Sequence, residues 1–589
     1  MRSFMTAYCH SVFVHSSLYP YQPDLIMRNP KLRTAAACLF ALSSTNLVST
    51  IALSAPAFEL PNPPSLPPLP GQGHDGKTAT PIKHLVVIFG ENISFDHYFG
   101  TYPNATNPKG EPFFLPRPGT PKINGLTKEL LTQNPNLNTA NGAGAANPFR
   151  LDRTQAHTAD QNHAYGPEQA AFDGGKMDLF PLYTGTAGTG GTGVFDTTGL
   201  VMGYYDGNTV TALWNYAQNF ALNDNSYSTN FGPSTPGAIN LISGQTNGAI
   251  GYTSDGTVVT SPVHNLVDDG QGGFTLYGDL DPYLDACSSG TKVEMKGRNI
   301  GDLLNERNIT WGWFEGGFDL TKTNANGTTG CSRSTYSPII GANGTDYIPH
   351  HQPFQYYAST RNPNHTRPSS VGVIGTSNDG GANHQYDTDD FTLAVKAHNM
   401  PAVSFLKAPA YQDAHPGYSD PLDEQTFVVN VINMLQKTEE WDSTAVVIAY
   451  DDSDGWYDHT HHVVNPSTSA QDYFLGTQLC GPIGSTLTAG VVPSNALNGI
   501  NGKPVNGRCG YGTRQPLLVV SPYAKENYVD HTLTDQSSIL RFIEDNWLKG
   551  EQIGQGSFDA KAGTIENMFD FSHKRIFRVF LDANKGTRD

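Results

Sequence analysis

The sequence has no surplus of positive charge. Its 36 lysines and arginines are outnumbered by 54 aspartates and glutamates, which gives a formal net charge of −18. A basic face that binds a nucleic-acid backbone is therefore not expected, and the same acidity disfavours contact with anionic lipid. A phosphate-bearing substrate stays open, because a bound metal ion reverses the local field.

Cysteine is scarce as well, with six in 589 residues and no C-x-x-C pair that would argue for a thiolate metal site. Cys9 and Cys38 lie in an N-terminal segment that we expect to be removed. The other four make an even number, which suits disulfides in an exported protein. Their order suggests the loop-closing pairs Cys287–Cys331 and Cys480–Cys509 and leaves other pairings open.

Internal repeats and low-complexity runs are absent, and the long apolar stretch lies near the N-terminus, at about residues 34–53. It follows three basic residues and ends in small ones, which is typical of a secretory signal. A single membrane anchor is the alternative. Met27 is an alternative start to Met1. The mature protein is expected to be secreted or periplasmic, without a stable membrane span.

The composition favours turns and long loops over helical bundles, since the chain has 61 glycines and 40 prolines. We expect residues 1–57 to be an N-terminal extension and signal peptide. Residues 58–81 are predicted to be a proline-rich linker. Residues 82–589 are predicted to form a single domain.

Buried strands are predicted where the sequence is continuously apolar. The runs are Ile82–Gly90, Ile309–Trp313, Ala402–Leu406, Ala445–Tyr450 and Leu517–Ser521. Between them lie segments of helical period: Thr209–Leu222, Asn299–Arg307, Glu424–Lys437, and Asp535–Leu548, which an Asp and a Ser pair open as caps.

This alternation predicts an α/β fold: a three-layer α/β/α sandwich with a mostly parallel central sheet. Long Gly- and Thr-rich stretches interrupt it at residues 184–198, 251–273 and 321–343. We expect these stretches to be loop insertions on the surface or lids over a site.

Two of the predicted strands end in pairs of oxygen-bearing side chains, Glu91–Asn92 and Asp451–Asp452. Ligands bind beyond the carboxyl ends of the strands in an open parallel sheet. The two pairs together therefore predict a site for a hard cation. The alternative is that these acids only cap turns.

A nucleophile candidate is Ser234, in NFGPSTPGAINLISG. Pro236 predicts a helix start, which would place the Ser234 hydroxyl at the positive end of a helix, where phosphate also binds. Contact with the metal would lower the pKa of the hydroxyl. A simple helix cap fits the local sequence equally well, and Thr235 is the neighbouring alternative.

A leaving alcohol needs a proton, and His415, in a loop after the strand at 402–406, is the candidate that can supply it near neutral pH or below. His163 and the pair His350–His351 are further candidates for contacting phosphate oxygens. Each histidine alone could equally be an ordinary hydrogen-bonded residue. The cluster of His459, His461 and His462 suggests a zinc site, but we expect His459 to support Asp451–Asp452 and the other two to lie in a loop.

Taken together, these blocks resemble a bacterial-type phosphoesterase family that contains phosphatidylcholine-type phospholipases C and secreted acid phosphatases, within the alkaline-phosphatase-like superfamily. The resemblance covers roughly Ile82 to Leu548. It rests on ordered blocks that include IKHLVVIFGENISFDHYFGTYP, FALNDNSYSTNFGPSTPGAINLISG, FLKAPAYQDAHPGYSDP and TAVVIAYDDSDGWYDH.

The resemblance implies an alkaline-phosphatase-like fold and an exported hydrolase of phosphate esters that holds one divalent metal ion (Ca²⁺, Mg²⁺, Mn²⁺ or Zn²⁺). It matches Glu91, Asn92, Ser234, Asp451 and Asp452 to the family's metal ligands. It also matches Ser234 to the nucleophile that forms a phosphoseryl intermediate, His415 to the residue serving the leaving group, and His163 and His351 to phosphate contacts.

Two positions depart from the family pattern. Gly237 stands where an Asn three residues after the nucleophile is common, and Asn240 is the candidate to replace it. The aspartate block usually reads Asp-Glu with a Gly pair, whereas here it reads Asp-Asp-Ser-Asp-Gly, from Asp451 to Gly455. We expect Asp454 to be a surface residue rather than an extra ligand.

The leading hypothesis is phospholipase-C-like cleavage of a phosphodiester such as a phospholipid head group. An acid phosphatase acting on phosphomonoesters is the alternative. A sulfatase is disfavoured, because GPSTPGAIN lacks the Arg of a C/S-x-P-x-R motif. From another class, a non-catalytic, metal-stabilised secreted binding protein remains open.

Overall fold

The computed structural model describes residues 77–188, 193–462 and 498–588. Every described residue belongs to one compact unit of the chain. The expected signal peptide, most of the expected linker and Cys480 lie outside the described residues and stay predictions. No helix in the described ranges is long and apolar enough to cross a membrane.

An eight-stranded sheet forms the centre of this unit, in the order β14-β11-β15-β1-β16-β17-β4-β18. Its strands are β1 (His84–Gly90), β4 (Ala221–Asn223), β11 (Trp311–Glu315), β14 (Gln385–Asp387), β15 (Val403–Lys407), β16 (Thr444–Tyr450), β17 (Leu517–Val520) and β18 (Tyr528–Asp530). The five strands from β14 to β16 are mutually parallel. The predicted α/β class and mostly parallel sheet are therefore confirmed.

One predicted strand runs in the opposite direction. The run at 517–521 forms β17, which is antiparallel to both β16 and β4. All four residues of β17 are buried, as are the residues of a central parallel strand. An apolar run therefore predicted burial correctly, but it carries no information on strand direction.

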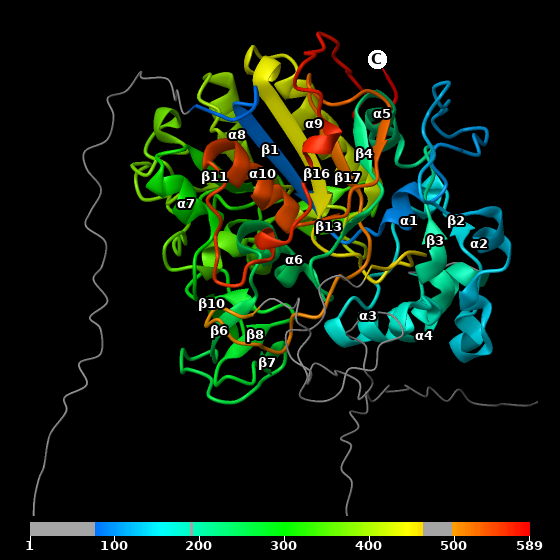
Figure 1. Ribbon diagram of the computed structural model, residues 1–589, viewed down its shortest axis with the longest axis horizontal. Coiled ribbons are helices and arrows are strands. Elements are labelled where there is room, and N and C mark those ends of the chain that lie inside the picture. Colours follow the sequence, from blue (N-terminus) through cyan, green and yellow to red (C-terminus); the bar gives the residue numbers. More distant parts are fainter. Residues whose placement is uncertain (1–76, 189–192, 463–497, 589) are drawn as a thin grey trace, which may run out of the picture. The chain divides into compact units, whose positions relative to one another are not determined.

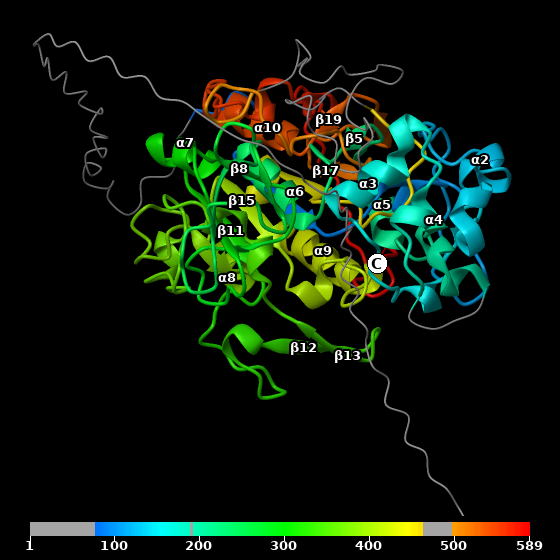
Figure 2. The same ribbon diagram turned by 90° about the horizontal axis from the view of Figure 1, so that it is seen from below.

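Helices cover the sheet at the four segments of helical period, at the helix start predicted from Pro236, and at residues 388–396, where no helix was predicted. They are α5 (Thr211–Asn219), α6 (Ser234–Ser243), α7 (Ile300–Glu306), α8 (Thr388–Lys396), α9 (Pro421–Leu435) and α10 (Ser537–Trp547). Figures 1 and 2 show α7 and α10 on one side of the sheet and α8 and α9 on the other, which gives the three layers. α10 also packs on α6.

Local sequence explains how these helices begin and end. Asp420 caps α9 by accepting hydrogen bonds from the backbone N–H groups of Leu422 and Asp423, and Pro421 fills the first position. The predicted segment 209–222 is too long, because α5 ends at Asn219 and β4 follows. In α10 the cap position is Gln536, which makes no side-chain bond, while the Asp535 carboxylate before it accepts from the backbone N–H groups of Ser537 and Ser538.

The predicted loop insertions contain regular structure that their sequence did not reveal. A five-stranded sheet, β7-β8-β6-β10-β9, includes residues 251–252 and 266–268 of the stretch 251–273. Its strands are β6 (Asn247–Tyr252), β7 (Leu266–Asp268), β8 (Phe274–Leu276), β9 (Asp281–Pro282) and β10 (Lys292–Met295). The stretch 321–343 contains β12 (Ser334–Ser337) and the start of β13 (Ala342–Thr345).

A second group of short elements, from the N-terminal third of the chain, lies to one side of the sheet (Figure 1). It comprises α1 (Phe95–Phe99), α2 (Lys128–Thr132), α3 (Tyr165–Phe172), α4 (Phe180–Tyr183) and the pair β2 (Phe149–Arg150) and β3 (Gly203–Tyr204). A further pair, β5 (Ser226–Tyr227) and β19 (Thr534–Asp535), joins the middle of the chain to its C-terminal part.

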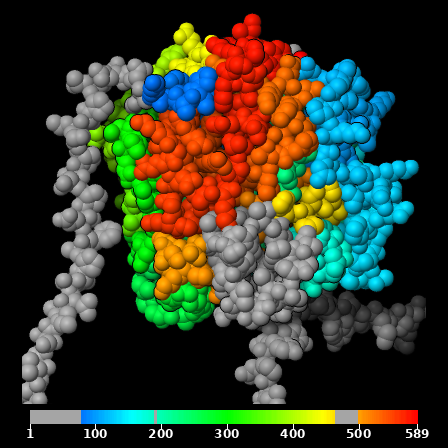
Figure 3. All heavy atoms as spheres, in the orientation of Figure 1, coloured from blue at the N-terminus to red at the C-terminus, as the bar shows by residue number. Residues whose placement is uncertain are grey.

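Covalent and polar ties hold distant segments together. The predicted disulfide Cys287–Cys331 is present, whereas Cys480–Cys509 stays a prediction because Cys480 is not described. At the start of the described chain, the backbone and hydroxyl of Thr80 both donate to Asn546 of α10. Figure 3 shows this N-terminal segment, in blue, bordered by the C-terminal segments in orange and red.

Candidate functional site

The two oxygen-bearing pairs meet because their strands are neighbours in the sheet. β1 and β16 pair in parallel up to Gly90 and Tyr450, so the next residues of both emerge at the same edge. The backbone N–H of Asn92 donates to Asp451 Oδ1 at 3.0 Å. Glu91, Asp451 and Asp452 each place a carboxylate oxygen within 4.8 Å of the others. The alternative that these acids only cap separate turns does not fit this convergence.

Ser234 lies against this acid cluster. It is the first residue of α6, whose cap position is Pro233, and its side chain makes no capping bond. Instead, Ser234 Oγ lies 2.9 Å from Glu91 Oε2 and 3.1 Å from Asp452 Oδ2. It is also 3.4 Å from Asn92 Oδ1. The interpretation of Ser234 as a simple helix cap is therefore wrong.

Gly237 explains how α6 comes so close to the acids. A Cβ atom at this position would meet the backbone oxygen of Asp451 at 2.1 Å, so only glycine allows this approach. An Asn would not fit here. Asn240 is no replacement at the site in this conformation, because its amide nitrogen donates to Asn230.

The neighbouring candidate Thr235 faces elsewhere. Its backbone N–H donates to Asp279 Oδ1 at 2.9 Å. Its hydroxyl lies 3.5 Å from the backbone oxygen of His350. Ser234, and not Thr235, therefore has its hydroxyl among the three acidic and amide oxygens of the predicted metal site.

Two charged residues beside the acid cluster, Lys407 and Asp413, were not predicted from the sequence. Lys407, the last residue of β15, contacts Glu91 Oε1 and lies 3.5 Å from Asp451 Oδ2. Asp413 belongs to a buried group with Glu91 and His351. The sequence did contain an indication of Lys407. It is the last residue of a buried strand, and Glu91 and Asp451 directly follow the ends of two other buried strands.

Burial and the repulsion between neighbouring carboxylates shift the pKa values of the cluster. Burial, together with repulsion from Asp451, raises the pKa of Glu91 well above its ordinary value. Burial likewise raises the pKa of Asp452 well above its ordinary value, and Asp451 adds to the effect. Burial acts in the same direction on Asp451, but Lys407 and several hydrogen bonds outweigh it and lower the pKa of Asp451.

These residues fit a divalent cation. All the donor atoms are carboxylate, amide or hydroxyl oxygens, which are the ligands of hard cations. Asp451 Oδ2 is buried and has no hydrogen-bond partner among the described residues, although Lys407 Nζ lies 3.5 Å away, so it can act as a ligand atom. Lys407 alone does not neutralise the four buried carboxylates of Glu91, Asp413, Asp451 and Asp452.

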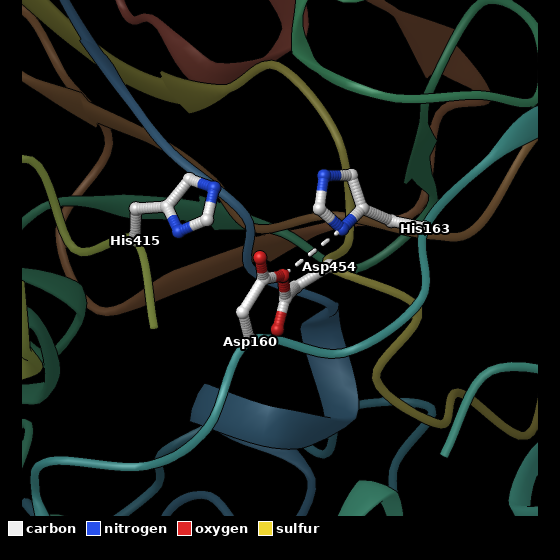
Figure 4. A group of neighbouring side chains, drawn as sticks. All are labelled: Asp160, His163, His415 and Asp454. Carbon is white, nitrogen blue, oxygen red and sulfur yellow. Dashed lines mark ion pairs between the residues drawn. The ribbon is translucent and has the colours of Figure 1, made fainter. Parts of the chain in front are cut away.

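The histidine candidates His163 and His415 lie together, with ring centroids 5.8 Å apart. Figure 4 shows them on either side of the carboxylates of Asp160 and Asp454. His163 Nδ1 is 3.2 Å from Asp454 Oδ1 and 3.5 Å from Asp160 Oδ1. One ligand atom of each of these four residues lies within 4.8 Å of the others.

The two rings differ in their proton affinity. Burial opposes the charged form of His163, but the carboxylates of Asp452, Asp454 and Asp160 outweigh it and raise its pKa well above the ordinary value. Burial lowers the pKa of His415 to about 4. At neutral pH the proton of this pair therefore belongs to His163, whereas the sequence analysis expected it on His415.

Asp454 is not the surface residue that we expected. It is fully buried, and its carboxylate accepts hydrogen bonds from the Asn92 amide at 2.9 Å and from the Gln161 backbone at 3.1 Å. A sharp turn after Asp452, with a positive φ of 54° at Asp454, directs it inward. Asp454 thus joins the acid cluster to the His163 side of the site.

The remaining histidines separate clearly. His351 is buried, with Nδ1 at 3.4 Å from Glu91 Oε1, whereas His350 points to Asp281. His459 contacts Asp96 at 2.6 Å. His461 and His462 instead lie against the rings of Phe172 and Tyr227. His459, His461 and His462 therefore have separate partners and do not form the zinc site that their spacing suggested.

Comparison with known proteins agrees with this picture. The profile of the Phosphoesterase family matches residues 82–548. A non-hemolytic phospholipase C of Pseudomonas aeruginosa is 23% identical over 84% of this chain and 58% of its own length. Phospholipase C A of Mycobacterium tuberculosis is 24% identical over 79% of this chain and 72% of its own length.

Solved structures give weaker matches. A Vibrio parahaemolyticus protein in the alkaline phosphatase superfamily matches with a TM-score of 0.23 and 12% identity, over 69% of this chain and 74% of that one. Murine ectonucleotide pyrophosphatase/phosphodiesterase 5 matches with a TM-score of 0.27 and 10% identity, over 61% and 95% of the two chains. The fold described above therefore rests on its own strand order.

Proposed function

Because this chain belongs to the Phosphoesterase family, we propose that it is an exported, metal-dependent hydrolase of phosphate esters. The observation that carries the proposal is the position of Ser234 Oγ, 2.9 to 3.4 Å from oxygens of Glu91, Asn92 and Asp452 at the start of a helix. The Ser234 hydroxyl is thus the nucleophile of the site. The match covers just over half the length of the Pseudomonas relative. The activity of that whole protein is therefore carried to this chain only as a proposal.

A divalent cation, whether Ca²⁺, Mg²⁺, Mn²⁺ or Zn²⁺, supplies positive charge for the phosphoryl oxygens and lowers the pKa of the serine hydroxyl. Its ligands would be Glu91, Asn92, Ser234, Asp451 and Asp452. The helix start adds backbone N–H groups that favour an anion at the same point.

In the first step, Ser234 Oγ forms a bond to phosphorus and the bond from phosphorus to the alcohol oxygen breaks. The hydroxyl proton passes to an adjacent carboxylate, since Glu91 and Asp452 are within hydrogen-bond distance. The departing alcohol takes a proton from His163, which holds the proton of the histidine pair, and the neutral His415 lies beside it. His351, beside Glu91, contacts the phosphoryl group.

In the second step, water forms a bond to phosphorus and the bond from phosphorus to Ser234 Oγ breaks. The freed Oγ takes back its proton from the carboxylate that accepted it, and the phosphate product leaves. The same histidine pair can accept a proton from that water, which returns the site to its starting state. The groups around the phosphoryl oxygens stabilise the charge of both transition states, which is the main catalytic effect in phosphoryl transfer.

The phospholipase C relatives favour a phosphodiester such as a phospholipid head group as substrate. A phosphomonoester is the alternative. A steady-state assay that compares p-nitrophenylphosphorylcholine with p-nitrophenyl phosphate, with and without chelator, separates the two. Metal-dependent turnover of the diester is expected, and turnover of neither compound by the metal-loaded protein would refute the proposal.

The nucleophile is tested by a matched pair of variants. Ser234→Ala should lose turnover by several orders of magnitude and keep its metal, because four of the five ligands remain. Thr235→Ala, one position further along α6, should keep turnover. A non-catalytic binding protein would show no turnover to lose in either variant.

Export is part of the proposal, and the disulfide Cys287–Cys331 supports it, because such bonds persist in oxidising compartments. Cell fractionation of the source organism tests it directly. The protein should appear in the periplasm or the medium, shortened at its N-terminus, and a full-length cytoplasmic protein would contradict the proposal.

A further inference from the structure

A hollow of about 800 Å³ lies away from the candidate active site. It is lined by the end of α5, by Glu526 in the loop after β17, and by residues near the C-terminus. β17 is antiparallel to β16, and β4 is antiparallel to β17, so β4 runs parallel to β16. The residues just before β4 therefore lie at the opposite edge of the sheet from Asp451. The C-terminus lies beside α5 in both views (Figures 1 and 2).

Three arginines of this hollow are fixed in place by neutral oxygens at the end of α5. Arg117 Nη1 donates to the backbone oxygen of Gln218 at 2.9 Å. Arg575 Nη1 donates to the backbone oxygen of Asn219 at 2.7 Å, and Arg588 donates to the Asn219 side chain. A guanidinium has five N–H donors, so these bonds hold each group while leaving most of its donors for another ligand.

The arginines are not matched by acids. Among the described residues that line the hollow there is one carboxylate, Glu526, at 2.6 Å from Arg117 and 3.7 Å from Arg575. Burial and the nearby charge of Arg117 lower the pKa of Arg588. This concentration of positive charge stands out in a chain of net charge −18.

The hollow also has an apolar wall. Ile576 is 93% exposed and Leu115 is 73% exposed. Phe577, 40% exposed, lies beneath the guanidinium groups of Arg575 and Arg588, at 5.5 and 5.4 Å from its ring centre. Guanidinium groups on an aromatic face keep their in-plane N–H donors free for an anion.

We propose that this arginine pocket (Arg117, Arg575, Arg588 and Phe577) binds a phosphate-class dianion attached to an apolar or aromatic body, separately from the catalytic centre. The planar guanidinium groups suit the oxygens of a phosphate in a bidentate manner. The dianion displaces Glu526 from Arg117, and the apolar body rests on the exposed wall.

Isothermal titration of the metal-loaded protein with phenylphosphonate, which is not hydrolysed as an ester, tests this proposal. The wild type should bind two equivalents, one at the active site and one in the arginine pocket. Arg575→Met should lose the pocket equivalent or bind it at least tenfold more weakly. The constant for competitive inhibition of this variant's turnover by phenylphosphonate should equal that of the wild type.

Glu526→Gln provides a test of opposite sign. Removing the competing carboxylate should tighten the pocket equivalent several-fold, and this variant does not depend on the loss of an arginine that also anchors α5. Arg307→Met, an exposed arginine paired with Glu551, is the matched control and should bind like the wild type.

Three results would overturn the proposal. The first is a single equivalent in the wild type that competes with substrate. The second is a second equivalent that neither Arg575→Met nor Glu526→Gln changes. The third is arginine-dependent binding to phosphatidylglycerol vesicles without binding of phenylphosphonate, which would make the patch a lipid-contact surface instead.

Discussion

Lys407 is the residue on which the charge balance of the acid cluster depends. It is buried and contacts Glu91 and Asp451, and Asp413 lies nearby. We expect Lys407→Met to destabilise the metal-free protein by roughly 3 to 5 kcal/mol, as removal of one partner of a buried ion pair does. The loss should be smaller with metal bound, because the cation then neutralises the same carboxylates.

Urea unfolding with and without chelator measures both values. Lys176→Met is the control, since Lys176 is exposed and pairs only with Asp173 among the described residues. It should leave the free energy of unfolding nearly unchanged. Equal losses in the two lysine variants would show that the buried lysine is not required for balance.

A second prediction at this scale concerns Glu424 and pH. Burial raises the pKa of Glu424 from 4.5 to about 7, against hydrogen bonds from Tyr98 and Tyr450. Because the folded-state pKa is the higher one, stability from this group is full below about pH 4.5 and is lost as the pH rises to 7. Glutamine mimics the protonated form.

The difference in the free energy of unfolding between Glu424→Gln and the wild type should therefore shift in favour of the variant by roughly 2 kcal/mol from pH 5 to pH 8. This follows from about 1.36 kcal/mol per pKa unit. Urea titrations at the two pH values measure this change. Glu129→Gln, on the surface of α2, should run parallel to the wild type. A wild type that gains stability relative to Glu424→Gln would reverse the assigned sign.

Among elements, α6 is the one whose position decides the chemistry. Its approach to β16 depends on Gly237, where a Cβ would overlap the Asp451 backbone oxygen. Gly237→Ala should force α6 and Ser234 away from the acids. We expect turnover to fall on the order of 100-fold, and stability by about 1 to 3 kcal/mol.

Gly372→Ala is a suitable control, because a Cβ there meets nothing within 4 Å. Turnover and thermal unfolding of both variants, measured with metal present, give the comparison. Full activity in Gly237→Ala would mean that the first turn of α6 can shift without moving the nucleophile.

The elements also show how far the sequence could predict the fold. Buried parallel strands were predictable from continuous apolar runs, and the rule that ligands gather at strand ends brought Glu91 and Asp451 together. The rule applied equally to Lys407, which was overlooked because a single lysine after a strand was not considered as part of an acidic site.

Other features were beyond local pattern. The inward direction of Asp454 depends on a left-handed turn and on Asn92, far away in sequence. The antiparallel direction of β17 depends on how the chain returns to the sheet. The short strands β7 and β8 flank a Gly-rich turn and pair with each other. Their strand structure depends on this pairing, which an alternating sequence pattern does not announce.

At the scale of the whole molecule, the proposed metal joins parts of the chain that are distant in sequence. Asn92 and Asp451 are 359 positions apart, and α6 comes from between them. Without a cation, the buried carboxylates of the cluster repel one another, and Lys407 offsets them only in part. Metal binding should therefore stabilise the folded domain as a unit.

A ligand that binds only the folded state, at 1,000 times its dissociation constant, adds about 4 kcal/mol to the free energy of unfolding. We expect chelation to lower the melting temperature of the wild type and to have little effect on Asp451→Asn, whose site has lost a ligand. Asp389→Asn, an exposed acid, should respond to chelation as the wild type does. If the metal-loaded wild type melted at the same temperature before and after complete removal of the metal, the cation would not be linking these segments, and the acids would have to be stabilised by Lys407 and by protonation alone.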